Sequence, residues 1–249
     1  MMALVRSVDG TPGPTAGASW TLRPCDVASS APACRAGSLR EMGAPHVTRL
    51  ALDATSWVDL VEGLVGEADA LHRDLSAGAA WRQGRVWRYE RWIDEPRLGA
   101  WQKGADRHPA LIGVERWLAT RYHVSFDGVS LAQYRDERDG VGWHRDREMC
   151  WLDNTVIGVL SLGARRPWRL RPLVAARRDD DDLGDAIELR PGPGDLLVMG
   201  GRCQADWLHA VPKLDTRCTS RISAQWRWTS RRGRRDVQPG YHAPRAFSK

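Results

Sequence analysis

The apolar residues of the chain recur first at helical spacing and later in short, strand-like runs. The run at residues 47–52 predicts a short strand. A capping-box-like start at residues 56–59 precedes apolar residues spaced by three or four, and this spacing predicts an amphipathic helix that ends near His72. A second helix is predicted over residues 110–122.

From residue 126 onward the pattern is that of a β-sheet protein. Short apolar runs separated by Gly, Pro and Asp turns predict strands at residues 129–134, 156–162, 168–173, 186–189, 196–199 and 221–228. Short strands of this kind indicate an antiparallel sandwich or barrel. The insert at 174–185 contains four consecutive Asp and is expected to be a solvated loop, because such a block cannot be buried unpaired. The predicted fold class is therefore α+β, mainly β.

Composition divides the chain into three parts. Residues 1–45 are rich in Gly, Pro, Ala and Ser without an apolar period, which predicts a disordered N-terminal extension. Residues 46–230 are expected to form one folded domain, with a hairpin at about 81–103 and a core at about 126–229. Residues 231–249 form a basic, turn-rich tail that is expected to be solvated.

Charge and cysteine content narrow the class of partner and the compartment. The formal net charge is +6, which favours a polyanion or an acidic small molecule as partner. Five Cys without a C-x-x-C pair indicate neither a disulfide framework nor a zinc ribbon, so we expect a reducing, cytoplasmic location. No apolar run approaches 18 residues, and we therefore expect no membrane span.

Planar side chains are over-represented. The chain has 13 Trp against 2 Phe, and Lys at only three positions leaves 34 Arg among its 37 basic residues. Residues 81–103 interleave Trp81, Trp87, Tyr89, Trp92 and Trp101 with five Arg. This segment is either a platform on which bases stack and phosphates pair, or a half-buried hairpin with solvated Arg. Composition bias explains the wider excess equally well.

Two His-Arg-Asp triplets are candidates for a metal site. His72 and Asp74 fall on the predicted helix, where residues two apart point about 200° apart and cannot share a metal. His144 and Asp146 follow a predicted strand, where residues two apart share a face. Neither triplet has the Asn that a kinase catalytic loop requires, so a kinase is excluded.

His209 is the candidate third ligand. Two His and one carboxylate form the facial triad of non-haem Fe(II) oxygenases, which leaves coordination positions open. For a lone His, a structural role is the alternative. A zinc hydrolase also fits this triad, but it leaves the Arg residues of the last strand unexplained.

The last predicted strand alternates with period two. Its polar face carries Arg221, Ser223, Gln225 and Arg227, and its apolar face carries Ile222, Ala224, Trp226 and Trp228. The polar face is directed either to solvent or into a pocket. In a pocket, the two Arg lie about 20 Å apart along the strand and could lean inward to clamp a dicarboxylate bidentately.

Five ordered blocks over about residues 81–229 resemble one known family. The blocks are Tyr134 with His144-Arg-Asp146-Arg-Glu148, Ser161 to Arg171, Gly194 to Met199, Gln204 to Lys213, and Arg221 to Arg227. They resemble the successive motifs of the AlkB-like Fe(II)/2-oxoglutarate dioxygenases, which repair alkylated nucleic acid. The resemblance implies a double-stranded β-helix, or jelly-roll, core with N-terminal helices and a nucleotide-recognition lid at about 81–103.

The resemblance also implies roles for single residues around the iron and 2-oxoglutarate. It implies His144, Asp146 and His209 as ligands of Fe(II). Arg221 would pair the distal carboxylate of 2-oxoglutarate with help from Tyr134. Ser223 and Arg227 would lie near the other end of the co-substrate. Many family members have Asn at the position of Ala132, so one contact to 2-oxoglutarate is expected to be missing.

On the substrate side, Glu148 matches the acidic residue that hydrogen-bonds the amine of the damaged base. His144 would also lie along one face of that base, and Trp87 and Tyr89 belong to the lid.

The implied activity is oxidative demethylation of N1-methyladenine and N3-methylcytosine in DNA, with release of formaldehyde. It uses Fe(II), O₂ and 2-oxoglutarate, and the base must be single-stranded or flipped out of a duplex. We expect a monomer with nucleic acid as partner and no membrane. The same chemistry on RNA or protein, and a non-catalytic nucleic-acid-binding module, are the alternatives.

Overall fold

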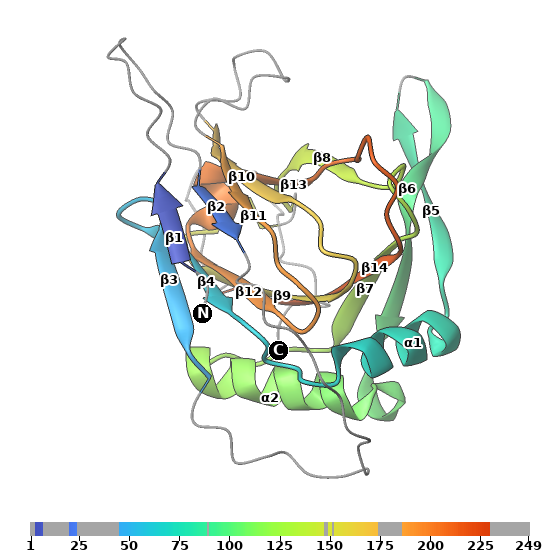
Figure 1. The fold of residues 1–249 in the computed structure, drawn as a ribbon, viewed down its shortest axis with the longest axis horizontal. Coiled ribbons are helices and arrows are strands. Elements are labelled where there is room, and N and C mark those ends of the chain that lie inside the picture. The colour runs from blue at the N-terminus through green and yellow to red at the C-terminus, as the bar shows by residue number, and fades with distance from the viewer. Residues whose placement is uncertain are drawn as a thin grey trace, which may run out of the picture.

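The computed structural model describes residues 3–6, 20–23, 45–88, 90–146, 149–150, 152–173 and 186–229. Two antiparallel sheets face each other, and two helices cover the outer face of the larger sheet (Figure 1). None of the helices in the described ranges is long and apolar enough to cross a membrane.

The larger sheet has eight strands. Their spatial order is β3 (Val47–Ala51), β4 (Ser56–Val61), β12 (Leu196–Gly201), β9 (Thr155–Gly163), β14 (Arg221–Thr229), β7 (Val129–Tyr134), β6 (Arg91–Gln102) and β5 (Arg82–Arg88). The smaller sheet has the order β11 (Ile187–Leu189), β10 (Trp168–Pro172), β13 (Trp207–Val211) and β8 (Val141–His144). The predicted mainly-β, jelly-roll fold class is confirmed.

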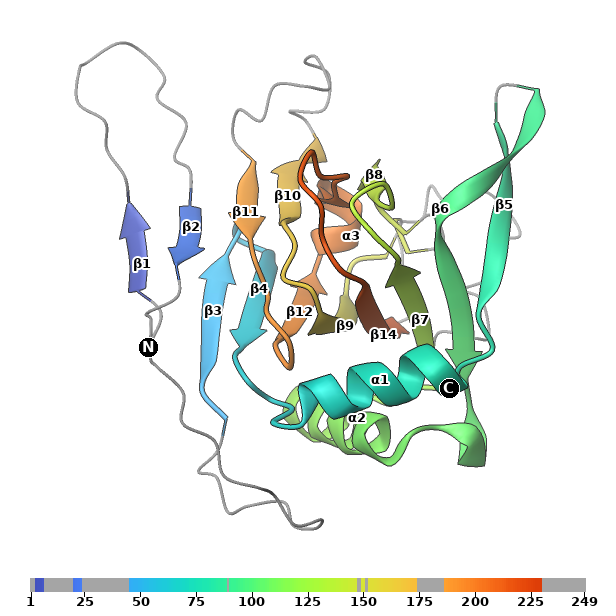
Figure 2. The same cartoon turned by 45° about the vertical axis from the view of Figure 1, so that its right-hand side comes forward.

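Helices α1 (Ala68–Gly78) and α2 (Pro109–Tyr122) lie side by side beneath the larger sheet (Figure 2). Two short elements, η1 (Gly104–Asp106) and α3 (Cys203–Asp206), complete the helical structure of the described residues. Leu71 and Leu75 of α1 and Leu111, Val114 and Leu118 of α2 are buried against the sheet. Burial of these five side chains fixes the helical layer.

Strand β14 separates two apolar cores. Ile222, Ala224 and Trp226 pack toward the helices. Ser223 and Gln225 lie on the opposite face, between the two sheets, where they line a pocket. Of the two orientations that the alternation allowed, the polar face is therefore directed into a pocket.

The helix predicted from residue 56 to His72 is wrong in its first half. Ser56–Val61 forms β4, which lies between β3 and β12, and helix α1 begins only at Ala68. Val58 and Leu60 pack in the core between the sheets, whereas Val61 packs in the core beneath the helices. Because β4 is buried on both faces, its apolar residues do not alternate with polar ones, and a short run of this kind cannot be told from a buried helix by periodicity.

Most of the other predicted helices and strands agree with the structure. The strand at 47–52, the helix at 110–122 and the strands after residue 126 are confirmed, whereas β8 and β13 were not predicted. Within the predicted N-terminal extension, β1 (Ala3–Arg6) and β2 (Trp20–Arg23) pair antiparallel. The insert at 174–185 and the tail at 231–249 lie outside the described residues, and the domain boundaries stay predictions.

Candidate active site

Two histidines meet on adjacent strands of the smaller sheet. His144 ends β8 and His209 lies in the middle of β13, and the two are directly paired in the ladder. Paired residues point to the same face, so their ring centroids are only 4.2 Å apart. Asp146 follows β8 by two residues, and the potential ligand atoms of the three side chains lie within 4.8 Å of one another. The structure thus brings together the three predicted metal ligands.

Both imidazoles are set to bind a metal. The Nδ1–H of His144 donates to the carbonyl oxygen of Gly142 at 2.9 Å, which leaves Nε2 as the free lone pair. Burial, together with the neighbouring His144, lowers the pKa of His209 to about 3, and burial also lowers the pKa of His144. Both rings are therefore neutral at pH 7, the form that coordinates a metal.

Two neighbours hold Asp146, one at its carboxylate and one at its backbone. The guanidinium Nε of Arg227 donates to Asp146 Oδ2 at 2.7 Å, and the backbone N–H of Asp146 donates to Gln204 Oε1 at 2.8 Å. Burial acts to raise the pKa of Asp146, but the charge and hydrogen bond of Arg227, together with the two histidines, outweigh it and keep that pKa well below the usual range. Asp146 is therefore ionised.

Arg221 is fully buried, and its Cζ lies 5.6 Å from the ring centroid of Tyr134, which lines the same pocket as the triad. Its Nη2 donates to Ser161 Oγ at 2.9 Å, whereas Nε and Nη1 have no partner among the described residues. Burial lowers its pKa to about 10, so it is still a cation at neutral pH. Two buried, unsatisfied donors on a cation fit an anionic ligand, because an isolated buried charge is otherwise costly.

The pocket is lined by the triad together with Tyr134, which contacts this arginine. Tyr134, Ser223, Gln225 and Arg227 supply polar groups to its lining. The apolar part of the wall consists of Val141, Ile157, Val159, Trp168, Met199 and Val211. This combination of a polar base and apolar walls suits a small dicarboxylate that must be shielded from water.

Arg227 takes a different set of partners from those expected of a co-substrate clamp. Besides Asp146, it donates to Ser130 Oγ at 2.6 Å and to Gln225 Oε1. Among the described residues, at least three protein acceptors thus occupy its guanidinium. Its predicted place near the second carboxylate of 2-oxoglutarate stays a prediction.

Several predicted substrate residues lie apart from this pocket or cannot be placed. Trp87 is 59% exposed in β5 and is not part of the lining. Glu148 and Tyr89 lie outside the described residues. Ala132 pairs with Ser223 and offers no polar side chain where many family members have Asn.

Sequence reasoning assigned no role to two residues of the site. Arg97 enters the pocket from β6. Burial acts to lower its pKa, but the nearby Tyr134 and Glu95 raise the pKa above its usual value. Gln204 is fully buried and holds the Asp146 backbone. Gln204 belonged to a recognised block, whereas nothing distinguished Arg97 from the other Arg of the hairpin.

The Gln204→Leu variant tests whether the Asp146 backbone needs this acceptor. We expect metal affinity to fall by about 10-fold to 100-fold, the usual effect of losing a group that orients a ligand. Anaerobic titration with Fe(II), or with Co(II) as a spectroscopic substitute, measures it. Gln133→Leu, on the face of β7 turned away from the pocket, is the matched control. Unchanged affinity in Gln204→Leu would show that Asp146 is held without Gln204.

Fold and site together define a class. Two His and one carboxylate in the lining of a jelly-roll pocket form the facial triad of non-haem Fe(II) oxygenases. The family model of the 2OG-Fe(II) oxygenase superfamily matches residues 51–235, and the chain belongs to this superfamily. Its cofactor and co-substrates are accordingly Fe(II), 2-oxoglutarate and O₂.

Within this superfamily, the chain is similar to curated AlkB homologues. The chain is 30% identical to alpha-ketoglutarate-dependent dioxygenase alkB homolog 3 of Bos taurus over 165 residues, which are 59% of this chain and 56% of that protein. It is 26% identical to the DNA oxidative demethylase ALKBH2 of Homo sapiens, over 59% of this chain and 62% of that protein. The predicted AlkB-like resemblance is confirmed. The chain spans little more than half the length of these relatives.

A solved structure agrees with the fold alone. A prolyl hydroxylase from Trichoplax adhaerens, in complex with a peptide fragment of hypoxia inducible factor, superposes with a TM-score of 0.51. The match has 12% identity and covers 69% of this chain and 82% of that chain.

Proposed function

We propose that this chain oxidatively demethylates N-alkylated bases, N1-methyladenine and N3-methylcytosine, in DNA. The observation that carries the proposal is the cluster of His144, Asp146 and His209 in one pocket with Tyr134. The Tyr134 ring contacts the buried Arg221, whose two free donors need an anion. The similarity to ALKBH2, a DNA oxidative demethylase, directs this chemistry toward DNA. We place the catalytic domain at residues 46–230 and the lid at about 81–103.

In this proposal the side chains hold and orient the reactants. His144, Asp146 and His209 would hold Fe(II), which with 2-oxoglutarate and O₂ supplies hydroxylation of the N-methyl group and leaves succinate, CO₂ and, after collapse, formaldehyde. Arg221 would bind the distal carboxylate of 2-oxoglutarate with its free Nε and Nη1. Tyr134 would donate its hydroxyl to the same carboxylate.

Other residues would keep the metal ligands and the substrate in place. The ion pair with Arg227 holds the Asp146 carboxylate in one rotamer. The apolar wall, which includes Ile157, Val159 and Met199, would exclude water from the reacting groups. By the family resemblance, Glu148 would hydrogen-bond the amine of the damaged base.

The β5–β6 hairpin is the proposed nucleic-acid surface. It projects beyond the neighbouring strands of the larger sheet (Figure 2). Trp87 and Trp92 are paired across it, 59% and 56% exposed, with their rings edge to face at 5.6 Å. Exposed rings of this kind stack on bases irrespective of sequence. Exposed Arg82, Arg85 and Arg91 on the same hairpin could pair with phosphates.

Removal of either exposed ring tests this surface. Trp87→Ala and Trp92→Ala are each expected to weaken binding of a single-stranded oligonucleotide by about 1–3 kcal/mol, the usual contribution of one base–aromatic stack. Fluorescence anisotropy at fixed salt measures the change. Trp101→Ala is the control, because it lies at the other end of β6, about 30 Å along the strand from Trp92. Equal losses in all three variants, or none, would contradict the proposed surface.

Side-by-side turnover on matched oligonucleotides tests the choice of DNA. Oligonucleotides of one sequence, made as DNA and as RNA and carrying one N1-methyladenine or N3-methylcytosine, are incubated with Fe(II) and 2-oxoglutarate. We expect formaldehyde release from DNA that His144→Ala abolishes. Faster turnover of RNA would assign the activity to RNA. Absence of turnover on both, with binding intact, would favour a non-catalytic module.

A further inference from the structure

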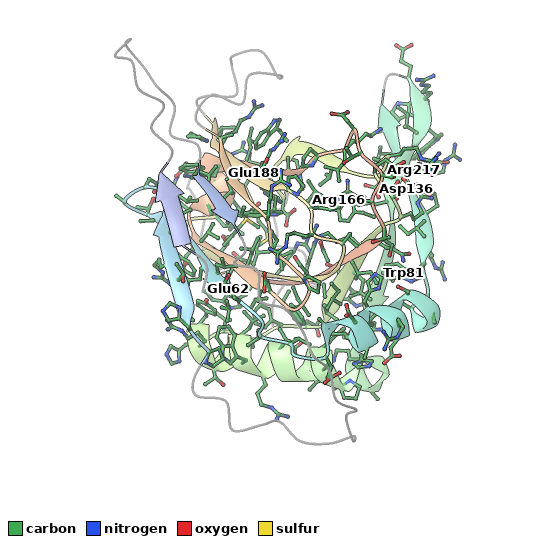
Figure 3. All side chains as sticks on the ribbon, in the orientation of Figure 1. Glu62, Trp81, Asp136, Arg166, Glu188 and Arg217 are labelled. Carbon is green, nitrogen blue, oxygen red and sulfur yellow. The ribbon has the colours of Figure 1, made fainter. Side chains whose placement is uncertain are left out.

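A second buried arginine lies in this region, and no role in the reaction has been assigned to it. Arg166 follows β9 and is fully buried in the interior of the protein, where Figure 3 labels it. Its Nη1 donates to the carbonyl oxygen of Asp136 at 2.9 Å. Its Nη2 donates to the carbonyl oxygens of Asp139 at 2.7 Å and Pro212 at 2.9 Å. One guanidinium therefore joins two separate segments of backbone.

Those two segments carry the histidines of the candidate site. Asp136 and Asp139 lie in the loop before β8, which ends in His144, and Pro212 directly follows β13, which contains His209. The loop approaches β13 closely, because a Cβ added to Gly140 would lie 2.9 Å from the carbonyl oxygen of Val211. Arg166 thus fastens the two histidine strands at their common end.

The same guanidinium also contacts the co-substrate end of the pocket. The Cζ of Arg166 is 5.4 Å from the ring centroid of Tyr134, and the Cζ of Arg221 is 5.6 Å from it. Within the described ranges neither arginine forms an ion pair with a carboxylate. Two buried cations therefore share one aromatic ring. Backbone carbonyl oxygens accept from Arg166, but no carboxylate in the described ranges neutralises either charge, and burying such charges is costly until an anion binds.

We propose that Arg166 is a positioning residue for the dicarboxylate co-substrate. It holds the Tyr134 ring in place and adds a second positive charge behind Arg221. The distal carboxylate of the co-substrate is consequently bound by the protein itself, without help from the metal. This proposal rests on the assignment of this pocket to 2-oxoglutarate, but it requires neither nucleic acid nor demethylation.

Glutarate binding to the full-length, metal-free protein tests it. Glutarate has the two carboxylates of 2-oxoglutarate but lacks the oxo group that chelates iron. Calorimetric titration in a chelating buffer is expected to show saturable binding to the wild-type protein. Arg166→Met is expected to weaken it about tenfold, because one buried charge at about 10 Å is removed at an effective dielectric constant near 20. Arg166→Lys, which keeps the charge, is expected to recover part of the affinity.

Two controls show whether Arg166 positions the co-substrate or only stabilises the fold: a surface variant, and a comparison of the effects on KM and kcat. Arg138→Met changes an arginine that is 82% exposed and paired with Asp136, and it should bind glutarate as the wild type does. In the iron-loaded enzyme, Arg166→Lys should raise KM for 2-oxoglutarate more than it lowers kcat.

The outcomes are decisive even if Arg166→Met fails to fold. Lack of glutarate binding by the folded, metal-free wild type would overturn the proposal. So would wild-type glutarate affinity in a folded Arg166→Lys or Arg166→Met protein. Failure to demethylate any oligonucleotide, with glutarate binding and the Arg166 effect intact, would reject the proposed function alone.

Discussion

His144→Ala is expected to abolish 2-oxoglutarate turnover and to lower Fe(II) affinity by more than about 100-fold. The His144 imidazole is the partner of His209 in the ladder, and no other His in the described ranges joins the cluster with Asp146. Loss of a direct ligand should exceed the 10-fold to 100-fold loss caused by removing a group that only orients one. Succinate formation and anaerobic Fe(II) titration measure the two effects.

The second His-Arg-Asp triplet provides the matched control. His72 hydrogen-bonds Ser220 Oγ at 3.0 Å, whereas Asp74 faces His108, so the two side chains of this triplet have separate partners. His72→Ala should therefore retain Fe(II) affinity and turnover per folded molecule. Equal losses in His72→Ala and His144→Ala would contradict the assignment of the metal site.

Arg221→Met is expected to raise KM for 2-oxoglutarate by about 100-fold or more. Two free donors of the buried guanidinium would be lost, and each hydrogen bond to a charged group contributes about 1.5–3 kcal/mol. The KM of Arg221→Lys should lie between those of the wild type and Arg221→Met, because Lys keeps the charge but lacks the bidentate fork. Steady-state decarboxylation at varied 2-oxoglutarate measures KM.

The same substitution should not destabilise the ligand-free protein. Met replaces an uncompensated buried cation with an apolar side chain of similar length, and such replacements are often neutral or stabilising. Arg217→Met, a change at an exposed arginine, is the control for both measurements. Unchanged KM together with a lower melting temperature would make Arg221 a structural residue and would contradict its proposed role.

The two arginine positions of β14 could be predicted because the strand obeys one local rule. Its polar and apolar residues alternate strictly, and in the structure the apolar face packs toward the helices while Ser223 and Gln225 line the pocket. Alternation alone left solvent as an equal possibility for the polar face. The choice depended on β8 and β13, which close the other side of the pocket.

The strands that carry the two histidines, β8 and β13, were not predicted because they are short and lack a strand-like alternation. Val141–His144 has only four residues and includes Gly142, and Trp207–Val211 follows the short helix α3 directly. Neither segment shows a clear alternation. Their pairing is set by contacts distant in sequence, among them the hydrogen bonds of Arg166. The His-Arg-Asp spacing and the family resemblance, rather than a prediction of β8 and β13, identified the metal ligands.

Positioning residues were the hardest part of the site to predict. Gln204 and Arg166 act through backbone groups 27 to 58 positions away in the chain. Neither contact follows from a local pattern. In an Arg-rich sequence a positioning arginine is also difficult to distinguish by residue type, since composition bias explains most of the arginines equally well.

Joint quantification of formaldehyde and succinate tests the central claim most directly. The wild-type protein, reconstituted anaerobically with Fe(II), is given O₂, 2-oxoglutarate and a single-stranded DNA oligonucleotide with one N3-methylcytosine. We predict equimolar formaldehyde and succinate with restoration of cytosine, and neither product in His144→Ala. Succinate without formaldehyde, or a methylated base left intact at full co-substrate turnover, would contradict oxidative demethylation of DNA by this site.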